Sequence, residues 1–133
     1  MIDQFIEWHD SIESEIGLIG SILSAKLSDE PEELIRDLQN AEAWNARTGY
    51  LLAEANSWLD RFSLFAMPTK EGRSEADRRV LLDSETSAIR MVRDTLEHYC
   101  NCIKNRLILG ESILSYVKQT YADRKGRETL EAV

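Results

Sequence analysis

The spacing of hydrophobic positions predicts helices along most of the chain. In the first segment, residues 2–27, apolar side chains recur at steps of three, four and seven residues, which places them on one helix face. The members of this stripe are Phe5, Ile12, Ile16, Ile19, Leu23 and Leu27. Gly17 and Gly20 lie beside the stripe, where small residues permit the close approach of another helix.

The stretch SDEPEEL, residues 28–34, predicts the end of one helix and the start of the next. Ser28 or Asp29 is a suitable N-cap, Pro31 suits a first helical turn, and the neighbouring glutamates favour the positive end of the helix dipole. We expect this second helix to extend to about residue 66. Its inner stripe consists of Leu34, Leu38, Ala41, Thr48, Leu52, Ala55, Leu59 and Phe62, with Trp44 and Trp58 beside it.

A third helix is expected after the break MPTKEGR, where Pro68 and Gly72 interrupt the pattern. Ser74 followed by Asp77 resembles a capping box that opens this helix. The pattern continues to residue 121, which corresponds to a helix of about 70 Å. Gly110 is the position at which such a helix would kink or end. Helices of this length favour association with other chains through a coiled-coil-like seam.

These patterns predict an all-α protein with three main helices, arranged as a bundle or as a coiled-coil-like oligomer. We expect one helical domain over residues 1–133. It comprises acidic N-terminal helices over residues 1–66, a loop over 67–74, a long C-terminal helix over 75–121 and a frayed tail over 122–133. No strand-like alternation and no repeat of about 20 to 50 residues is evident.

The charge of the chain is negative overall and uneven along its length. The net charge is −8, which disfavours nucleic-acid binding by the whole surface. Residues 1–60 hold 13 acidic and 3 basic side chains, against 11 and 13 in residues 61–133. The polarity suggests two ends with different partners, although two solvated helix faces of different charge also account for it.

Targeting signals are not evident in the sequence. The N-terminal stretch MIDQFIEWHD is acidic and lacks the basic region and apolar run of a secretory leader. No stretch approaches the roughly 18 to 20 apolar residues of a membrane span. We therefore expect a cytoplasmic protein, in the host cytoplasm if a phage encodes it, with no membrane partner.

The stretch RDTLEHYCNCIKNR, residues 93–106, carries the densest candidate chemistry in the chain. His98 and Cys102 are four residues apart and share a helix face, which is half of a zinc site. A structural site needs four ligands, and Cys100 points to the other side of the helix. The two cysteines cannot bridge each other on one helix, so we expect reduced thiols, no bound metal and no cofactor.

Arg93 and His98 fit the pattern R-x4-H, which resembles the motif of HEPN domains. These are all-α folds, many of them ribonucleases. The resemblance implies that Arg93 stabilises phosphate charge and that His98 transfers a proton. Cys100 stands where many family members have a tyrosine. On one straight helix, residues five apart diverge by about 140°. A HEPN-like ribonuclease is thus the enzymatic alternative.

A cationic stripe on the long helix suggests phosphate binding instead. At about 100° per residue, its basic side chains fall on one face, beside an apolar stripe that includes Leu96 and Ile103. Glu97 and Glu111 lie within the same face and could neutralise it through pairs four residues apart. The basic members are Arg79, Arg90, Arg93, Lys104 and Lys118.

The order of segments resembles that of small phage recombination mediators of the UvsY type. The resemblance spans the last 90 residues or so and rests on AEAWNARTGYLLAEANSWLD, the polar break PTKEGRSEADR and LEHYCNCIKNRLILGESIL. It implies a non-enzymatic oligomer that binds single-stranded DNA and helps load a recombinase. The piece IKNR carries over Lys104 and Arg106 as DNA contacts, to which the cationic stripe adds Arg90 and Arg93. The acidic first 60 residues depart from that pattern and would face a basic partner protein.

A third alternative is an acidic helical interaction module, such as an inhibitor or antitoxin. Its acidic face would dock on a basic protein surface. Small-molecule catalysis is not expected, because the chain lacks phosphate-binding loops, nucleophile elbows and zinc-protease motifs. The acidic face consists of Glu7, Asp10, Glu13, Glu32, Glu33, Asp37 and Glu42.

Overall fold

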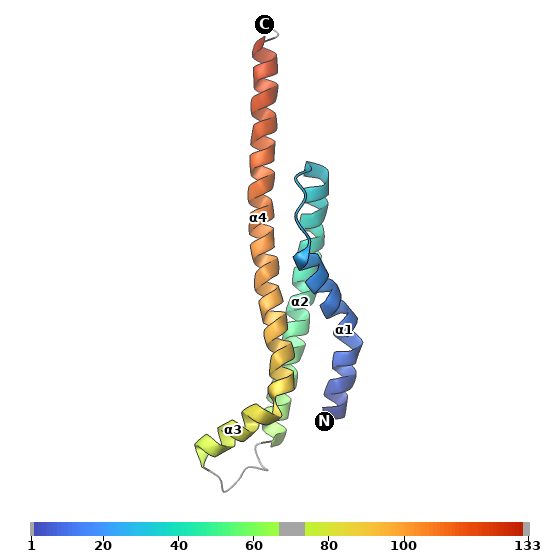
Figure 1. Ribbon diagram of the computed structural model, residues 1–133, viewed down its shortest axis with the longest axis vertical. Helices are drawn as coiled ribbons and strands as arrows, with labels where there is room; N and C mark the ends of the chain where they lie inside the picture. Colours follow the sequence, from blue (N-terminus) through green and yellow to red (C-terminus); the bar gives the residue numbers. More distant parts are fainter. Residues whose placement is uncertain (1, 67–73, 132–133) are drawn as a thin grey trace.

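The computed structural model describes residues 2–66 and 74–131, which form helices joined by short connections. Within those ranges it contains no strand, which confirms the all-α class. The chain forms two long antiparallel helices, α2 and α4, side by side, with α1 against their flank and α3 projecting from one end (Figure 1). The helices are α1 (Ile2–Ser24), α2 (Pro31–Ala66), α3 (Glu75–Glu85) and α4 (Ser87–Glu131).

The core lies where α1, α2 and α4 meet. Each helix contributes one apolar stripe, and burial of these stripes is the main force that holds the three together. Of two neighbouring leucines on α2, Leu51 is fully buried, whereas the expected Leu52 is only partly buried beside the core. The buried cluster comprises Ile12, Ile19, Ala41, Leu51, Ala55, Leu96 and Ile103.

Polar contacts also fasten α1 to α2. The indole Nε1 of Trp8 donates a hydrogen bond to Glu54 Oε2 at 2.5 Å. The guanidinium of Arg47 donates two hydrogen bonds of 2.7 Å to the two carboxylate oxygens of Glu15. This pairing lowers the pKa of Glu15, chiefly through the hydrogen bond and further through the charge of Arg47. Two long side chains are thereby held in one geometry at the edge of the core.

Two glycines allow the helices to approach closely. A Cβ on Gly20 of α1 would lie 2.9 Å from the Tyr99 hydroxyl of α4, so only glycine fits there without a shift. A Cβ on Gly110 of α4 would overlap the side chain of Leu38 on α2, lying 3.2 Å from its Cγ. The expectation that Gly110 kinks or ends the long helix is wrong, because α4 continues through it. Its role is to accommodate Leu38.

The N-terminus of α2 is capped by a different residue from the Ser28 or Asp29 expected from the sequence. The carbonyl of Glu30 accepts the first helical bond, from the Leu34 amide at 2.8 Å, so Glu30 occupies the N-cap position. The Ser28 hydroxyl supports it by accepting from the Glu30 amide at 3.1 Å and donating to the Glu33 carboxylate at 2.8 Å. Pro31 opens the helix as expected.

The expected single helix over 75–121 is interrupted at Thr86, which separates α3 from α4. The buried Thr86 hydroxyl donates to the Leu82 carbonyl at 2.8 Å and accepts from Arg90 Nε at 3.3 Å. A threonine that bonds back to the preceding turn weakens and bends a helix. The start of this region agrees with its prediction, since the Ser74 hydroxyl accepts from the Asp77 amide at 3.1 Å. The rest of the expected loop, 67–73, lies outside the described residues.

The expected frayed tail over residues 122–133 is also wrong as far as the structure describes it, because α4 continues to Glu131. We call residues 115–131 the C-terminal extension. It continues α4 beyond the start of α2 (Figure 1). Every residue from 115 to 128 is exposed except Val117, which is half-buried.

Candidate nucleic-acid interface

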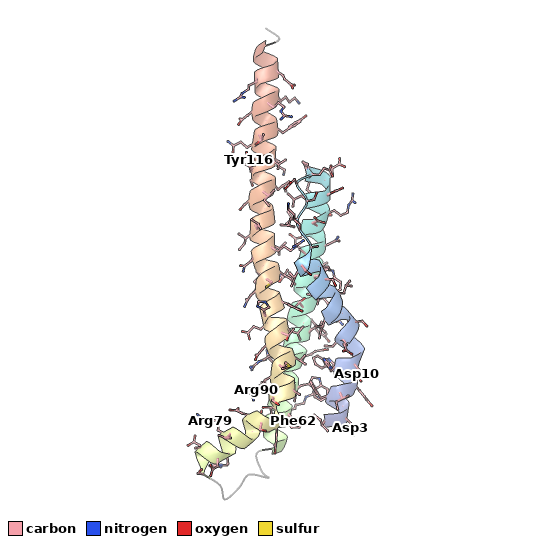
Figure 2. All side chains as sticks on the ribbon, in the orientation of Figure 1. Asp3, Asp10, Phe62, Arg79, Arg90 and Tyr116 are labelled. Atoms are coloured by element: carbon pink, nitrogen blue, oxygen red, sulfur yellow. The ribbon has the colours of Figure 1, made fainter. Side chains whose placement is uncertain are left out.

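Arg90, the first of the expected DNA contacts, makes hydrogen bonds within the chain at the corner between α3 and α4. Its guanidinium donates to the Asp83 carbonyl of α3 and to the Thr86 hydroxyl. Side-chain bonds that cross the break hold the two helices at their angle. Figure 2 shows Arg90 at this corner, with Arg79 further out on α3. Arg90 therefore has a structural role that explains its presence without a ligand.

Arg93 is also engaged within the chain. Its guanidinium pairs with the neighbouring Asp94 carboxylate at 2.9 Å, and its side chain is 29% exposed. The partner considered in the sequence was Glu97, one turn further along the helix. The pairing with Asp94 leaves Arg93 with a neutralised charge, which weakens its attraction for phosphate.

Lys104 and Arg106 lie on opposite sides of α4. The Arg106 guanidinium donates to the Ala25 carbonyl at 2.7 Å and so satisfies the carbonyl end of α1. Lys104 is exposed. Residues two positions apart on a helix point about 160° apart, so these side chains cannot line one strand together. Of the four expected contacts, only Lys104 is exposed and makes no hydrogen bond or ion pair with another described residue.

The Arg93 and His98 side chains of the R-x4-H pattern do not meet within one chain. They are five residues apart on the uninterrupted helix α4, so they diverge by about 140°. Arg93 contacts Asp94, whereas His98 Nε2 lies 3.5 Å from Cys102 Sγ. One chain therefore offers no position from which both groups reach a single phosphate.

The thiols and the histidine of this stretch do not form a metal site in the part of the chain that is described. No group of three or more His, Cys, Asp or Glu side chains converges there. Cys100 is buried, and burial raises the pKa of its thiol. Cys102 is half-buried, and both cysteines are free.

The acidic face expected for a basic partner is divided in two by the fold. Glu7, Asp10 and Glu13 lie on the first half of α1, which begins at the opposite end of the molecule from the start of α2. Figure 2 places Asp3 and Asp10 at that lower end. The remaining acids are at the start of α2, where Glu33 and Asp37 face Ser28. Each half is a separate acidic surface.

The C-terminal extension combines exposed bases with exposed aromatic rings. Tyr116 is 73% exposed and Tyr121 is 66% exposed. Single-strand binding sites combine basic side chains, which neutralise phosphates, with aromatic rings, on which nucleobases stack. At about 100° per residue, Lys118, Tyr121 and Lys125 fall within about 60° of one another. The exposed basic residues of the extension are Lys118, Arg124, Lys125 and Arg127.

Lys118 belongs to the cationic stripe expected from the sequence, but Arg124, Lys125 and Arg127 were missed because residues 122–133 were expected to fray. Once the helix continues, the segment YVKQTYADRKGR brings its bases and tyrosines onto a rigid surface. The signal available in the sequence was the spacing of Asp123 and Arg127, and of Arg124 and Glu128, each four residues apart. Such pairs favour helix formation.

Comparison with family models, with curated proteins and with solved structures gave no match. No helix of the described residues is long and apolar enough to span a membrane.

Proposed function

We propose that the protein is a non-enzymatic accessory protein of DNA recombination that forms oligomers and binds single-stranded DNA. The observation that supports it is the C-terminal extension, where basic side chains and tyrosines share one helix and are exposed among the described residues. The contacts move from Arg90, Arg93 and Arg106 to the exposed face of Lys118 and Tyr121, with Lys125 on the same side of the helix. Lys104 continues as a peripheral contact.

The binding mode follows from the chemistry of this face. The ammonium groups of Lys118 and Lys125 neutralise backbone phosphates and release counterions, so affinity depends on salt. The ring of Tyr121 stacks on a base, which favours single strands because their bases are accessible. Neither contact reads the sequence of the DNA.

The acidic first half of α1 supplies the second interaction surface. Its exposed carboxylates repel DNA and attract a basic protein. The resemblance to recombination mediators makes a recombinase the candidate partner. The exposed acids on this surface are Asp3, Glu7, Asp10 and Glu13.

Binding of a labelled single strand of about 40 nucleotides, measured by fluorescence anisotropy, tests the DNA proposal. We expect affinity to fall steeply between about 50 and about 200 mM salt. The double variant Lys118→Ala, Tyr121→Ala should bind at least about tenfold more weakly, because it loses one phosphate contact and one stacked ring.

The matched control is the double variant Arg36→Ala, Tyr50→Ala. It also removes one exposed base and one exposed tyrosine, but from the acidic half of the molecule. We expect its affinity to equal that of the unchanged protein. Equal losses in both double variants, or binding that ignores salt, would contradict the proposal.

The same samples test the enzymatic alternative when single-stranded RNA is added. We expect the RNA to remain intact, because Arg93 and His98 do not converge. Cleavage that is abolished by both Arg93→Ala and His98→Ala would replace the DNA proposal with a ribonuclease.

A further inference from the structure

Helix α4 carries a second stripe that faces away from α2, in which all side chains are exposed except those of Thr95 and Cys102, which are half-buried. Its members recur at alternating steps of four and three residues, which is the heptad spacing of a coiled-coil seam. They fall within a sector of about 100° on the helix, and none of them is Asp, Glu, Lys or Arg. We call it the outer stripe; it comprises Met91, Thr95, His98, Cys102, Asn105, Leu109, Ser112 and Tyr116.

The large apolar members of the outer stripe are exposed to an extent that core residues are not. Met91 is 73% exposed, Leu109 is 56% exposed and Tyr116 is 73% exposed, whereas Leu96 on the inner side of α4 is fully buried. A row of uncharged side chains of this length on a chain that is 30% charged is the pattern of a contact surface.

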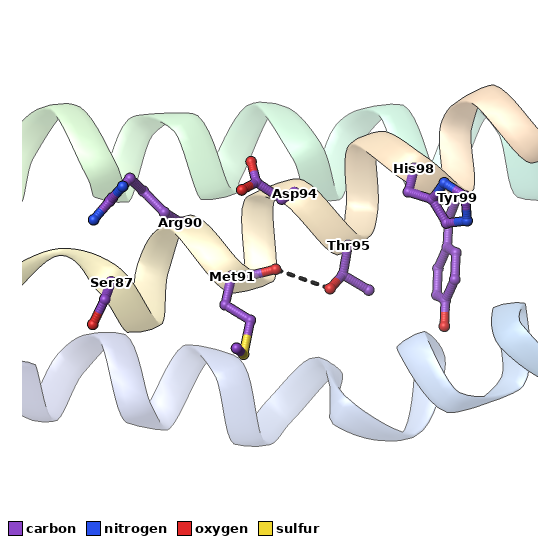
Figure 3. Close-up of a pocket in the computed structure, with 7 residues that line it drawn as sticks. All are labelled: Ser87, Arg90, Met91, Asp94, Thr95, His98 and Tyr99. Atoms are coloured by element: carbon purple, nitrogen blue, oxygen red, sulfur yellow. Dashed lines mark hydrogen bonds between the residues drawn. The ribbon is translucent and has the colours of Figure 1, made fainter. Parts of the chain in front are cut away.

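Two hollows follow the outer stripe along α4. The first, of about 610 Å³, includes Met91, Thr95 and His98 in its lining. The second, of about 500 Å³, lies between α4 and the connection that follows α1, and includes Cys102, Asn105 and Leu109. Figure 3 shows Met91, Thr95 and Tyr99 pointing from α4 toward the side on which α1 lies. We call the two hollows together the trough; residues of the outer stripe line both of them.

We propose that a second copy of this chain occupies the trough, with the two α4 helices antiparallel and a two-fold axis midway between Ile103 and Lys104. In this register the members of the outer stripe meet in layers, and the two-fold axis generates a second copy of each layer. An antiparallel coiled coil has this arrangement of seam positions. The layers pair Met91 with Tyr116, Thr95 with Ser112, His98 with Leu109, and Cys102 with Asn105.

The chemistry of the paired positions fits a second copy. The thioether of Met91 meets the ring of Tyr116, a contact that is favourable between sulfur and aromatic groups. The small side chains of Thr95 and Ser112 share one layer, so neither leaves a void beside a large residue. A single polar residue in a seam, here Asn105, fixes register and the number of strands.

Charge complementarity selects the antiparallel orientation. In this register the C-terminal extension of one copy passes the lower end of the other, where α1 begins (Figure 1). Residues whose numbers sum to 207 lie level in this register, so Arg124 comes opposite Asp83 of the other copy, an exposed acid at the end of α3. A parallel pair would place the two basic extensions side by side instead. The face of Lys118 and Tyr121 points away from the outer stripe and stays accessible.

Disulfide trapping tests the register. Met91→Cys and Tyr116→Cys are made as two separate chains, each with Cys102→Ser, and are mixed before mild oxidation. Cys100 stays in both because it is buried. We expect a covalent dimer from the mixture, since paired positions meet the distance that a disulfide requires.

Each single variant alone should stay uncrosslinked, because the two copies of position 91 are separated by about 38 Å along the axis. The same offset separates the two copies of position 116. Self-crosslinking of either variant, or an uncrosslinked mixture, would overturn the register. A parallel pair would place the two copies of position 91 in one layer, so self-crosslinking of Met91→Cys would also overturn the orientation.

Light scattering after size exclusion, without DNA, tests the interface. We expect the unchanged protein to have the mass of two chains and Tyr116→Glu to have the mass of one. The control Tyr121→Glu introduces the same charge at a similarly exposed tyrosine about 140° away on α4 and should remain a dimer. A monomeric unchanged protein, or dissociation by the control alone, would contradict the proposal. Because no DNA is present, this result is separate from the fate of the DNA-binding proposal.

Discussion

The two stretches of α4 are helical for different reasons. Residues 87–114 place Ile89, Leu96 and Ile103 in the core, each almost fully buried against α1 and α2. Residues 115–131 form the C-terminal extension, in which all but one of the residues from 115 to 128 are exposed. The first stretch is stabilised by tertiary packing, whereas the second depends on helix propensity and on the turn that precedes it.

This difference shows how a packed helix supports an unpacked one. Starting an isolated helix is unfavourable, and segments shorter than about 12 to 15 residues are marginal in water. The extension avoids that step because it grows from a helix already formed in the core. Its bases at 118, 124, 125 and 127 are thereby held outside the core on a rigid support, at no loss of buried apolar surface.

The largest expected effect separates the two stretches by a change in the core. Leu96→Ala removes a fully buried side chain and leaves a cavity, which should lower the free energy of unfolding by about 3 kcal/mol. Tyr121→Ala in the extension should leave it unchanged. Urea unfolding followed by far-ultraviolet circular dichroism measures both, and equal losses would show that the extension is packed in solution.

The same substitution at two glycines of α4 should have opposite effects. Gly110→Ala brings a Cβ against Leu38, and this overpacking should destabilise the protein by about 1 kcal/mol after the gain in helix propensity. Gly126→Ala meets nothing within 4 Å and should increase the helicity of the extension. Thermal melting and circular dichroism measure the two changes. A stabilising Gly110→Ala would mean that Leu38 moves aside easily.

The smallest expected effect concerns the ion pair that holds α1 to α2. Glu15→Gln should lower stability by about 0.5 kcal/mol at neutral pH, since partly exposed pairs contribute little. The folded-state pKa of Glu15 lies below its ordinary value of 4.5, so the contribution is present above that value and is lost as the pH falls through the lowered pKa. Unfolding curves at pH 7 and at strongly acidic pH measure it. A difference between the two proteins that persists in acid would argue against this origin.

Periodicity was sufficient to predict the elements whose apolar stripe is buried. Phe5, Ile12 and Ile19 on α1 are buried as the pattern indicates, because a helix with one apolar face has one way to cover it. The choice between Leu51 and Leu52 was wrong, since the two residues are neighbours and periodicity alone does not decide between adjacent positions. Packing against the other helices made that choice.

The interruption at Thr86 could not be read from periodicity, because the stripe of apolar residues resumes on the far side of it. The available signal was the cluster Ser84, Thr86 and Ser87, whose hydroxyls compete for backbone hydrogen bonds. The decisive contact, from Arg90 to the Asp83 carbonyl, depends on the angle between two helices. Such an angle is a tertiary property.

The sequence shows which side chains of α4 are basic, but it does not show which of them are exposed at the candidate site. Lysines and arginines of α4 were correctly identified as basic side chains on a helix, yet sequence does not show which of them have internal partners. Arg106 donates to a carbonyl 81 residues away in the chain, and no local pattern reports that contact. Exposure of Lys118 and Tyr121 depends on where α2 begins, which also follows from the fold.

The antiparallel pairing of α2 with α4 has a consequence for how the chain folds. The end of α2 at Ala66 and the start of α4 at Ser87 are 21 residues apart in sequence, whereas Leu38 and Gly110, which meet at the far end, are 72 residues apart. Loop closure costs less for contacts of low sequence separation, so we expect α2 and α4 to pair first where α2 ends and α4 begins. Pairing then proceeds toward Leu38 and Gly110, and α1 docks last. Amide hydrogens of α1 should then exchange with solvent through a local opening, while those around Leu96 exchange only when the whole molecule unfolds.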